Sequence, residues 1–245
     1  VIHLDTALFR YPFRIAVKDG IAIIMDLHNA DCFFHAFSYP EWKYMTSFGK
    51  RGEGPEEMSS ADCFRFISTD SIWTLDANRM RTTRWKIEQN MHKITSVETV
   101  DMDKRLVRAL DFYPMESGFL VTDYLGEYRQ KWTDQQGKWI NSTNEIPTRK
   151  YNEKISRPIL AQAWRSFIDY NPQKKILAMA TQLGEVLEIY NFKTLCNLLY
   201  MVLMVNQNFK VLHLMLYQSV LWALVIYKSQ IIISIQYSMV RHSKK

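Results

Sequence analysis

The stretch Asp70-Ser-Ile-Trp-Thr-Leu-Asp76 decides the fold class of this 245-residue chain. It is a short run of mainly apolar and β-branched residues that ends at an acidic residue, which is typical of a strand followed by a turn. Ser117-Gly-Phe-Leu-Val-Thr-Asp123 has the same form, and Arg14-Ile-Ala-Val-Lys-Asp-Gly-Ile-Ala-Ile-Ile-Met-Asp26 joins two such runs through Asp-Gly, a strong hairpin signal. Residues 1–200 carry no sustained helical period, so we predict an all-β body.

The strand-ending aspartates recur at a spacing that suits a repeated sheet. Asp26, Asp76 and Asp123 lie 50 and 47 residues apart, and Asp111-Phe-Tyr-Pro114 returns 58 residues later as Asp169-Tyr-Asn-Pro172. A period of about 45–60 residues is what a four-stranded propeller blade with its loops requires. We therefore predict an incomplete β-propeller of the six-bladed type, with about four blades in residues 1–200; a β-sandwich is the alternative.

Composition and charge exclude several functions. The net charge of +6 arises largely from residues 201–245, which hold five basic residues and no acidic one, and the body keeps 26 basic against 25 acidic residues. The body lacks the basic stripe of a nucleic-acid-binding protein, so no nucleic-acid partner is expected. Three cysteines lie far apart without a Cys/His cluster, so neither a zinc site nor any other cofactor is predicted.

A glycine-rich loop follows an aromatic stretch. Ser47-Phe-Gly-Lys-Arg-Gly-Glu-Gly-Pro-Glu-Glu-Met58 places Gly49, Gly52, Gly54 and Pro55 within seven residues, which indicates a tight turn. The loop lacks the Lys-Ser/Thr pair of a phosphate-binding P-loop, and acidic residues follow its proline. We interpret it as a structural turn between blades.

This loop also carries a family resemblance. Phe-Gly-x-x-Gly-x-Gly-Pro-x-Glu resembles the blade junction of NHL-like repeats, and is most similar to the TolB-like six-bladed propeller proteins of Bacteroides-type bacteria; Tyr11-Pro-x-Arg14-Ile and Phe119-Leu-Val-Thr-Asp-Tyr124 fit the same family. Glu56 and Met58 depart from the usual Gly and Phe. The resemblance covers roughly residues 5–195. It implies a cell-envelope protein, periplasmic or an outer-membrane lipoprotein, with membrane association only by a lipid anchor outside this fragment, and it carries over no catalytic residue.

Residues 201–245 form an anomalous apolar tail, predicted as a region separate from the propeller domain of residues 1–200. The tail contains no Gly, Pro, Asp or Glu, whereas residues 1–200 hold all eight glycines and all seven prolines. Met-Val pairs such as Met201-Val202 hide an obligatory Gly codon in another reading frame. We hypothesise a frameshift near Tyr200 that replaced blade sequence and truncated the chain; a membrane anchor and a terminal helix or strand pair are the alternatives. The chain shows no signal sequence and begins at Val1, which we interpret as a trimmed N-terminus.

Catalytic motifs are not evident. The six histidines are scattered without metal-ligand spacing, and there is no Gly-x-Ser-x-Gly. Asp26, Asp76 and Asp123 are the candidates for an axial metal in a lactonase-like propeller hydrolase. Aspartate also caps turns locally, which is the interpretation we favour.

Aromatic residues near polar neighbours are the candidate ligand contacts. Tyr124, Tyr128, Arg129, Trp132 and Trp164 lie where loops at the strand ends of a propeller would bind a ligand, although packing within the blades is the alternative role. The sequence thus favours a non-catalytic propeller that binds a protein, peptide or glycan.

Overall fold

The computed structural model describes residues 9–88, 93–146, 155–183, 186–194 and 196–201, and four short segments beyond them. The chain divides into two compact units, Val1–Arg165 and Ser166–Lys245.

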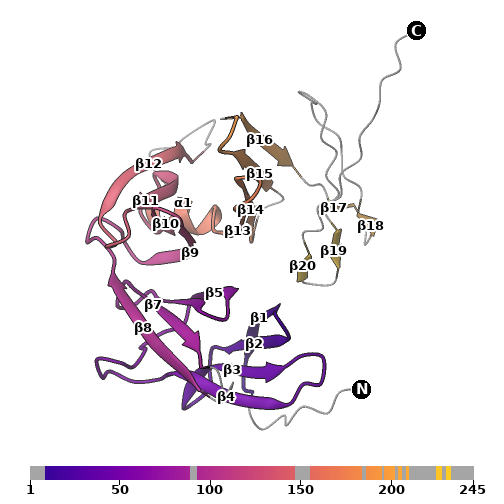
Figure 1. The fold of residues 1–245 in the computed structure, drawn as a ribbon. Helices are drawn as coiled ribbons and strands as arrows, with labels where there is room; N and C mark the ends of the chain where they lie inside the picture. Colours follow the sequence, from indigo (N-terminus) through magenta and orange to yellow (C-terminus); the bar gives the residue numbers. More distant parts are fainter. Residues whose placement is uncertain are drawn as a thin grey trace. The chain divides into compact units, whose positions relative to one another are not determined.

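The first unit contains three four-stranded antiparallel sheets, each built from consecutive strands (Figure 1). The first sheet is β1 (Pro12–Lys18), β2 (Ile21–Asp26), β3 (Cys32–Ser38) and β4 (Tyr44–Lys50). The second sheet is β5 (Cys63–Ser68), β6 (Ser71–Asp76), β7 (Arg81–Ile87) and β8 (Ile94–Asp101). The third sheet is β9 (Ala109–Met115), β10 (Gly118–Asp123), β11 (Tyr128–Thr133) and β12 (Trp139–Glu145). Four consecutive antiparallel strands form the blade of a β-propeller, so the predicted repeat is confirmed.

The hairpin predicted between β1 and β2 is present. Lys18 pairs with Ile21, and the two turn residues Asp19 and Gly20 have φ angles of 49° and 73°. Positive φ at both central positions is the requirement of the turn that matches the twist of antiparallel strands. The local sequence therefore specifies this connection without help from the rest of the molecule.

Apolar side chains join neighbouring sheets of the first unit. One cluster packs Met25, Phe34 and Phe48 of the first sheet against Phe64 and Trp85 of the second, including ring contacts between Phe34 and Phe64 and between Phe48 and Trp85. A second cluster joins the second and third sheets. The first strands β1, β5 and β9 contact one another in succession, as the inner strands of adjacent blades do.

The glycine-rich loop connects β4 to β5, as expected for a turn between blades. The Arg79 guanidinium donates to the carbonyl oxygens of Gly52, Gly54 and Glu57, at 2.8–3.2 Å. The Glu57 carboxylate accepts the Gly54 N–H at 2.9 Å. Side chains from within the loop and from the second sheet thus fix the loop.

The second unit contains one further four-stranded sheet, formed by β13 (Ser166–Asn171), β14 (Ile176–Thr181), β15 (Val186–Asn191) and β16 (Cys196–Met201). Asp111 lies in β9 and Asp169 in β13, so the sequence repeat corresponds to the first strands of two blades. Two short strand pairs follow, β17 (Met204–Val205) with β18 (Asn208–Phe209) and β19 (Val225–Tyr227) with β20 (Gln230–Ile232). The remaining residues of the apolar tail lie outside the described part, and the frameshift stays a prediction.

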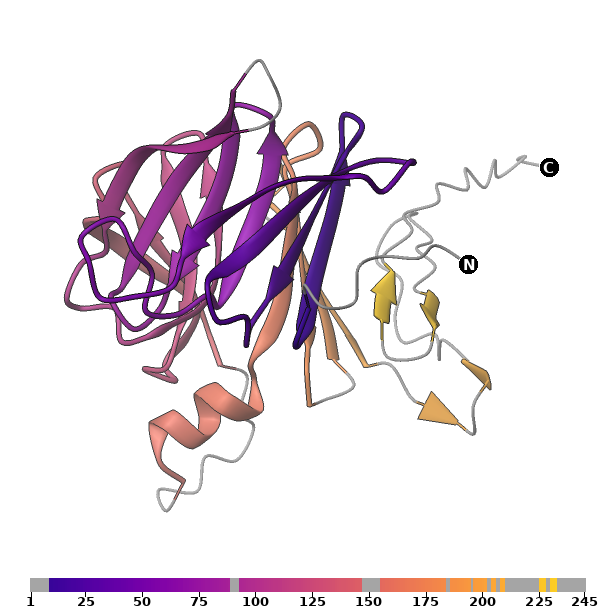
Figure 2. The same ribbon diagram turned by 90° about the horizontal axis from the view of Figure 1, so that it is seen from below.

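One helix interrupts the all-β pattern. Helix α1 (Arg157–Ala163) lies beyond the strand ends of the first unit (Figure 2). Pro158 lies in its first turn, where the ring supplies a helical φ and removes an N–H that would have no partner. In the described part of the chain, no helix is long and apolar enough to cross a bilayer.

Candidate functional site

The first strand-ending aspartate is held by hydrogen bonds from the backbone of its own blade. Asp26 is fully buried at the end of β2, and its carboxylate accepts the N–H groups of Arg10, Tyr11 and His28 at 2.6–3.1 Å. Burial raises the pKa of Asp26, but these hydrogen bonds outweigh it and hold the pKa below its ordinary value. The carboxylate therefore ties the segment before β1 to the turn after β2.

Asp76 and Asp123 repeat this arrangement in the next two sheets. Asp76 accepts the N–H groups of Ser59, Asn78 and Arg79 at 2.7–3.1 Å. Asp123 accepts those of Val107 and Leu125 at 3.1 and 3.2 Å, and it pairs with buried Lys131 at 3.1 Å. In each blade the aspartate bonds to the turn after it and to the chain before the first strand, which is the geometry of a structural cap.

The fourth sheet lacks this carboxylate. Its second strand ends at Thr181, whose hydroxyl accepts the N–H of Val186 at 3.2 Å. Within the described residues, no three His, Cys, Asp or Glu side chains are grouped closely enough to hold a metal ion. Asp26, Asp76 and Asp123, the candidates for an axial metal, form no such group among the described residues, and their oxygens accept hydrogen bonds from backbone N–H groups.

A buried charge cluster links the first strands of three blades. Arg14, Arg65 and Asp111 are each the third residue of their strand, β1, β5 and β9. The Asp111 carboxylate forms ion pairs with the guanidinium groups of Arg65 at 2.7 Å and Arg14 at 3.4 Å. Burial raises the pKa of Asp111, but the two guanidinium groups outweigh it and keep the pKa below its ordinary value. Burial raises the pKa of neighbouring Cys63 to about 12, so its thiol stays protonated.

A second set of hydrogen-bonded polar side chains lies on the face of the first sheet that is turned away from the second sheet, which we call the outer face. The His35 Nδ1 lies 2.7 Å from the Ser47 hydroxyl, which in turn lies 2.8 Å from the Tyr44 hydroxyl. Phe9 covers the His35 ring edge-on, with centroids 5.4 Å apart. Burial lowers the pKa of His35, and the charge of Asp26 raises it only in part. The ring is therefore neutral at pH 7.

Helix α1 is fastened to the third sheet by the predicted aromatic and arginine side chains. The Tyr124 hydroxyl donates to Gln162 Oε1 at 2.5 Å. The Arg129 guanidinium donates to the Trp164 carbonyl at 2.6 Å and lies 5.2 Å from the centre of the Trp164 ring. Arg129 is buried, so its side chain holds the helix in place and is not exposed to bind a ligand.

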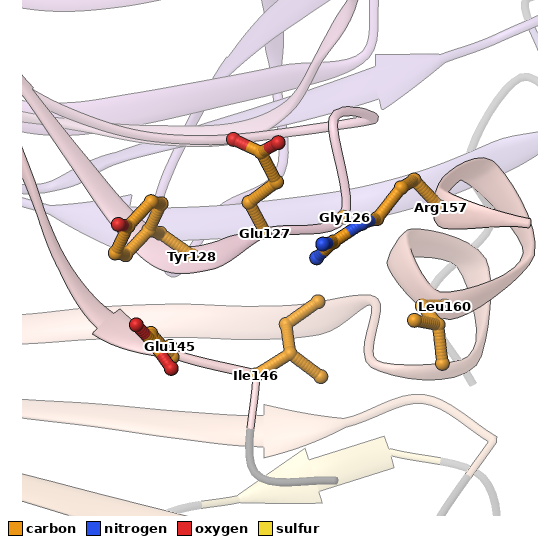
Figure 3. A pocket seen from close by; sticks show the side chains of 7 residues that line it. All are labelled: Gly126, Glu127, Tyr128, Glu145, Ile146, Arg157 and Leu160. Carbon is orange, nitrogen blue, oxygen red and sulfur yellow. The ribbon is translucent and has the colours of Figure 1, made fainter. Parts of the chain in front are cut away.

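A pocket of about 350 Å³ opens between α1 and the ends of β11 and β12 (Figure 3). Its lining consists of Gly126, Glu127, Tyr128, Glu145, Ile146, Arg157 and Leu160. In Figure 3 the Arg157 side chain extends from α1 toward Gly126 and Glu127, with Ile146 beneath it, whereas Tyr128 and Glu145 lie to the side. Charged groups therefore surround an apolar floor made by Ile146 and Leu160, both buried.

The structure brings four of the five predicted contact residues to this region. Tyr128 lines the pocket, while Tyr124, Arg129 and Trp164 hold its helical wall. Trp132 lies apart within the third sheet, where its indole N–H donates to the Thr143 hydroxyl at 2.9 Å. Of these five, only Tyr128 lines the pocket itself.

The sequence analysis did not predict the helix, and with it one wall of the pocket. Arg157 and Leu160 come from a helix of seven residues, which is too short to show an apolar period. The available signal was Ser156-Arg157-Pro158, a favourable N-cap residue with proline in the first turn. Glu127 and Glu145 had no local signal, because isolated glutamates usually lie in solvent.

Repeated up-and-down sheets define the chain as a β-propeller protein. It belongs to the TolB-like 6-blade propeller-like family, whose model matches residues 1–211. The predicted family and fold class are thus confirmed.

Several solved structures are similar to this chain at low sequence identity. They include a Bacteroides fragilis protein named "Putative exported protein" (11% identity, TM-score 0.49, 82% of this chain and 74% of that one). Others are a functionally unknown Desulfotomaculum acetoxidans protein (13%, 0.45, 77% and 54%) and a streptogramin B lyase (11%, 0.48, 78% and 54%). The chain spans about half the length of the latter two. No curated protein matches significantly in sequence.

Proposed function

We propose that this chain is a non-catalytic, ligand-binding propeller of the cell envelope, which binds a protein, peptide or glycan through the pocket beside α1. The pocket is the observation that carries the proposal, because the short helix α1, inserted in the sequence after β12, is fixed against the third sheet by specific side-chain bonds. Insertions at the strand ends of a rigid scaffold are where binding residues concentrate. Membership of the TolB-like family supports the envelope location.

The strand-end carboxylates support binding rather than metal-dependent hydrolysis. Asp26, Asp76 and Asp123 accept backbone N–H groups that would lose their partners if the carboxylates turned toward a metal. Losing a buried hydrogen-bond partner costs about 1–3 kcal/mol per group. Added calcium should therefore leave the melting temperature unchanged; a rise at millimolar calcium would revive the hydrolase alternative.

Peptide and glycan arrays test the proposal directly. The wild-type protein should bind some array members, and Arg157→Ala should lose them, because Arg157 forms the helical wall of the pocket. Arg84→Ala is the matched control, since Arg84 pairs with Glu98 on the surface of the second sheet. If both variants bind like the wild type, the pocket is not the binding site.

A further inference from the structure

Aromatic side chains gather at the hairpin that joins β3 to β4. The Tyr39 ring meets the Trp42 ring edge-on, with centroids 5.5 Å apart, and the Tyr44 ring meets the Phe37 ring edge-on at 5.8 Å. Tyr39 and Tyr44 are nevertheless 42% and 51% exposed. We call Tyr39, Trp42 and Tyr44 the aromatic hairpin. Exposed rings that neighbouring rings already hold in place lose little conformational entropy when a ligand covers them, so they favour binding.

Backbone hydrogen bonds fix the shape of this hairpin. The Trp42 N–H donates to the Ser38 carbonyl and the Ser38 N–H to the Lys43 carbonyl, both at 2.9 Å. The Tyr39 N–H donates to the Gly20 carbonyl of the neighbouring turn at 2.8 Å. Trp42 is held at a φ of 58°, which is uncommon for a bulky side chain. Such backbone conformations concentrate at binding sites, where the surrounding structure maintains them.

The aromatic hairpin offers hydrogen-bond donors beside its rings. Within the described part of the chain, the Trp42 indole N–H and the Tyr39 hydroxyl have no hydrogen-bond partner, whereas the Tyr44 hydroxyl lies 2.8 Å from that of Ser47. Glu41 and Lys43 flank Trp42 with opposite charges, so the hairpin has no net charge. The matching ligand is therefore neutral, with apolar surface for the rings and acceptors for the two donors.

A proline-rich segment in the polyproline II conformation has both properties. Its pyrrolidine rings are apolar, and its backbone carbonyl oxygens accept no hydrogen bond within the segment. Aromatic surfaces are an established means of binding such segments. A neutral sugar is the alternative ligand, and it needs a flat aromatic face. The Tyr39 and Trp42 rings stand at 85° to each other, and the Tyr44 and Phe37 rings at 71°, so the rings do not form one flat surface.

We propose that the aromatic hairpin binds a proline-rich peptide, whose rings pack on Tyr39 and Tyr44 and whose carbonyl oxygens accept from the Trp42 indole N–H and the Tyr39 hydroxyl. The hairpin lies at the end of the first sheet where β1 also turns into β2. The pocket beside α1 includes the turn between the second and third strands of its sheet, and such turns lie at the opposite strand ends. This site is therefore separate from the pocket and does not depend on its ligand.

Titration with fluorescein-labelled octaproline, followed by fluorescence anisotropy, tests the inference. Octaproline should bind, and a labelled Gly-Ser octapeptide should bind at least about tenfold more weakly, since it lacks the rings and loses more conformational entropy. Trp42→Phe and Tyr39→Phe keep an aromatic ring and each remove one donor, so each should weaken octaproline about fivefold.

Tyr11→Phe is the matched control, because Tyr11 is 51% exposed and lies before β1, at the strand end away from the hairpin. It should leave octaproline binding unchanged. An equal loss in Tyr11→Phe would overturn the inference, as would wild-type binding by Tyr39→Phe, which removes a hydroxyl that no described residue bonds. If octaproline does not bind but cellohexaose does, and Trp42→Phe weakens it, the hairpin binds a glycan and the peptide class is wrong.

Arg157→Ala separates this inference from the proposed function. It alters the pocket and should leave octaproline binding unchanged. If it abolishes octaproline binding, the peptide occupies the pocket, so the inference falls while the binding function of the pocket stands. If octaproline depends on Trp42 and Tyr39 but no array ligand depends on Arg157, the inference stands and the proposed function falls.

Discussion

At the scale of single residues, the strand-ending aspartates do more than terminate strands. Asp26, Asp76 and Asp123 each join a turn to the chain entering the same blade, across 15–17 residues. Their spacing was visible in the sequence, because the cap depends on local chain geometry. Arg14, Arg65 and Asp111 were not predicted as a cluster, because each comes from a different blade and only the tertiary fold brings them together.

Removing one of these caps should destabilise the first unit. Asp76→Ala removes the acceptor of the Ser59 and Arg79 N–H groups and of the Ser59 hydroxyl. The Ser60 hydroxyl keeps Asp62, and the Asn78 N–H keeps the Ser60 hydroxyl. The free energy of unfolding should fall by about 3 kcal/mol. Denaturant unfolding measures this change. Asp70→Ala is the control, because the Asp70 carboxylate forms an exposed pair with Lys86 and its removal should cost less than about 1 kcal/mol. Equal losses would show that Asp76 is not a cap.

His35 should make stability depend on pH. Burial lowers its pKa in the folded chain below the ordinary value of 6.5, so the unfolded chain takes up the proton more readily. The contribution of the neutral ring to the free energy of unfolding is fully present above about pH 6.5 and is lost as the pH falls below this value. His35→Phe keeps the ring contact with Phe9 and should flatten the dependence of unfolding free energy on pH between about 6.5 and 5. An unchanged slope would assign the dependence to other groups.

At the scale of elements, the strands were predictable and the helix was not. The hairpin turn at Asp19-Gly20 requires positive φ at both positions, so its sequence specifies its structure. Helix α1 instead depends on tertiary contacts at Gln162 and Trp164, whose partners lie 35–38 residues earlier. A seven-residue helix is marginal in isolation, so its packing decides its existence.

Gly126 should be essential for the position of α1. Its φ is 69°, and a Cβ there would collide with the Arg157 carbonyl. Gly20 has a similar φ of 73°, but its Cβ would meet only the Tyr39 carbonyl at 3.7 Å, an ordinary contact. Gly20→Ala should therefore lower the free energy of unfolding only by the backbone strain of alanine at a positive φ, about 1 kcal/mol. Gly126→Ala should cost at least about 1 kcal/mol more and should increase amide exchange in α1. Equal costs, with α1 exchange unchanged, would contradict this packing.

At the scale of the whole molecule, the repeat period identified the blades because each blade is a local unit of consecutive strands. The period could not identify the pocket, because the pocket is formed where an insertion breaks the repeat. The described part contains four four-stranded sheets, whereas the matching family is six-bladed. The sheets of the first unit bury apolar clusters between them. On the outer face of the first sheet, turned away from the second sheet, β1 keeps exposed apolar side chains.

That outer face should cause self-association in solution. Phe13, Ile15 and Val17 alternate along β1 and are 39%, 51% and 46% exposed, although the strand is an inner strand of a blade. Contiguous exposed apolar surface on a strand promotes association. Replacing Ile15 and Val17 together by Thr keeps β-branching and should reduce the concentration-dependent mass increase seen in sedimentation velocity, with stability changed by less than about 1 kcal/mol. Ile140→Thr is the control, because Ile140 is equally exposed at 53% but isolated on the edge strand β12. If Ile140→Thr reduces association as much as the double variant, the β1 face is not its cause.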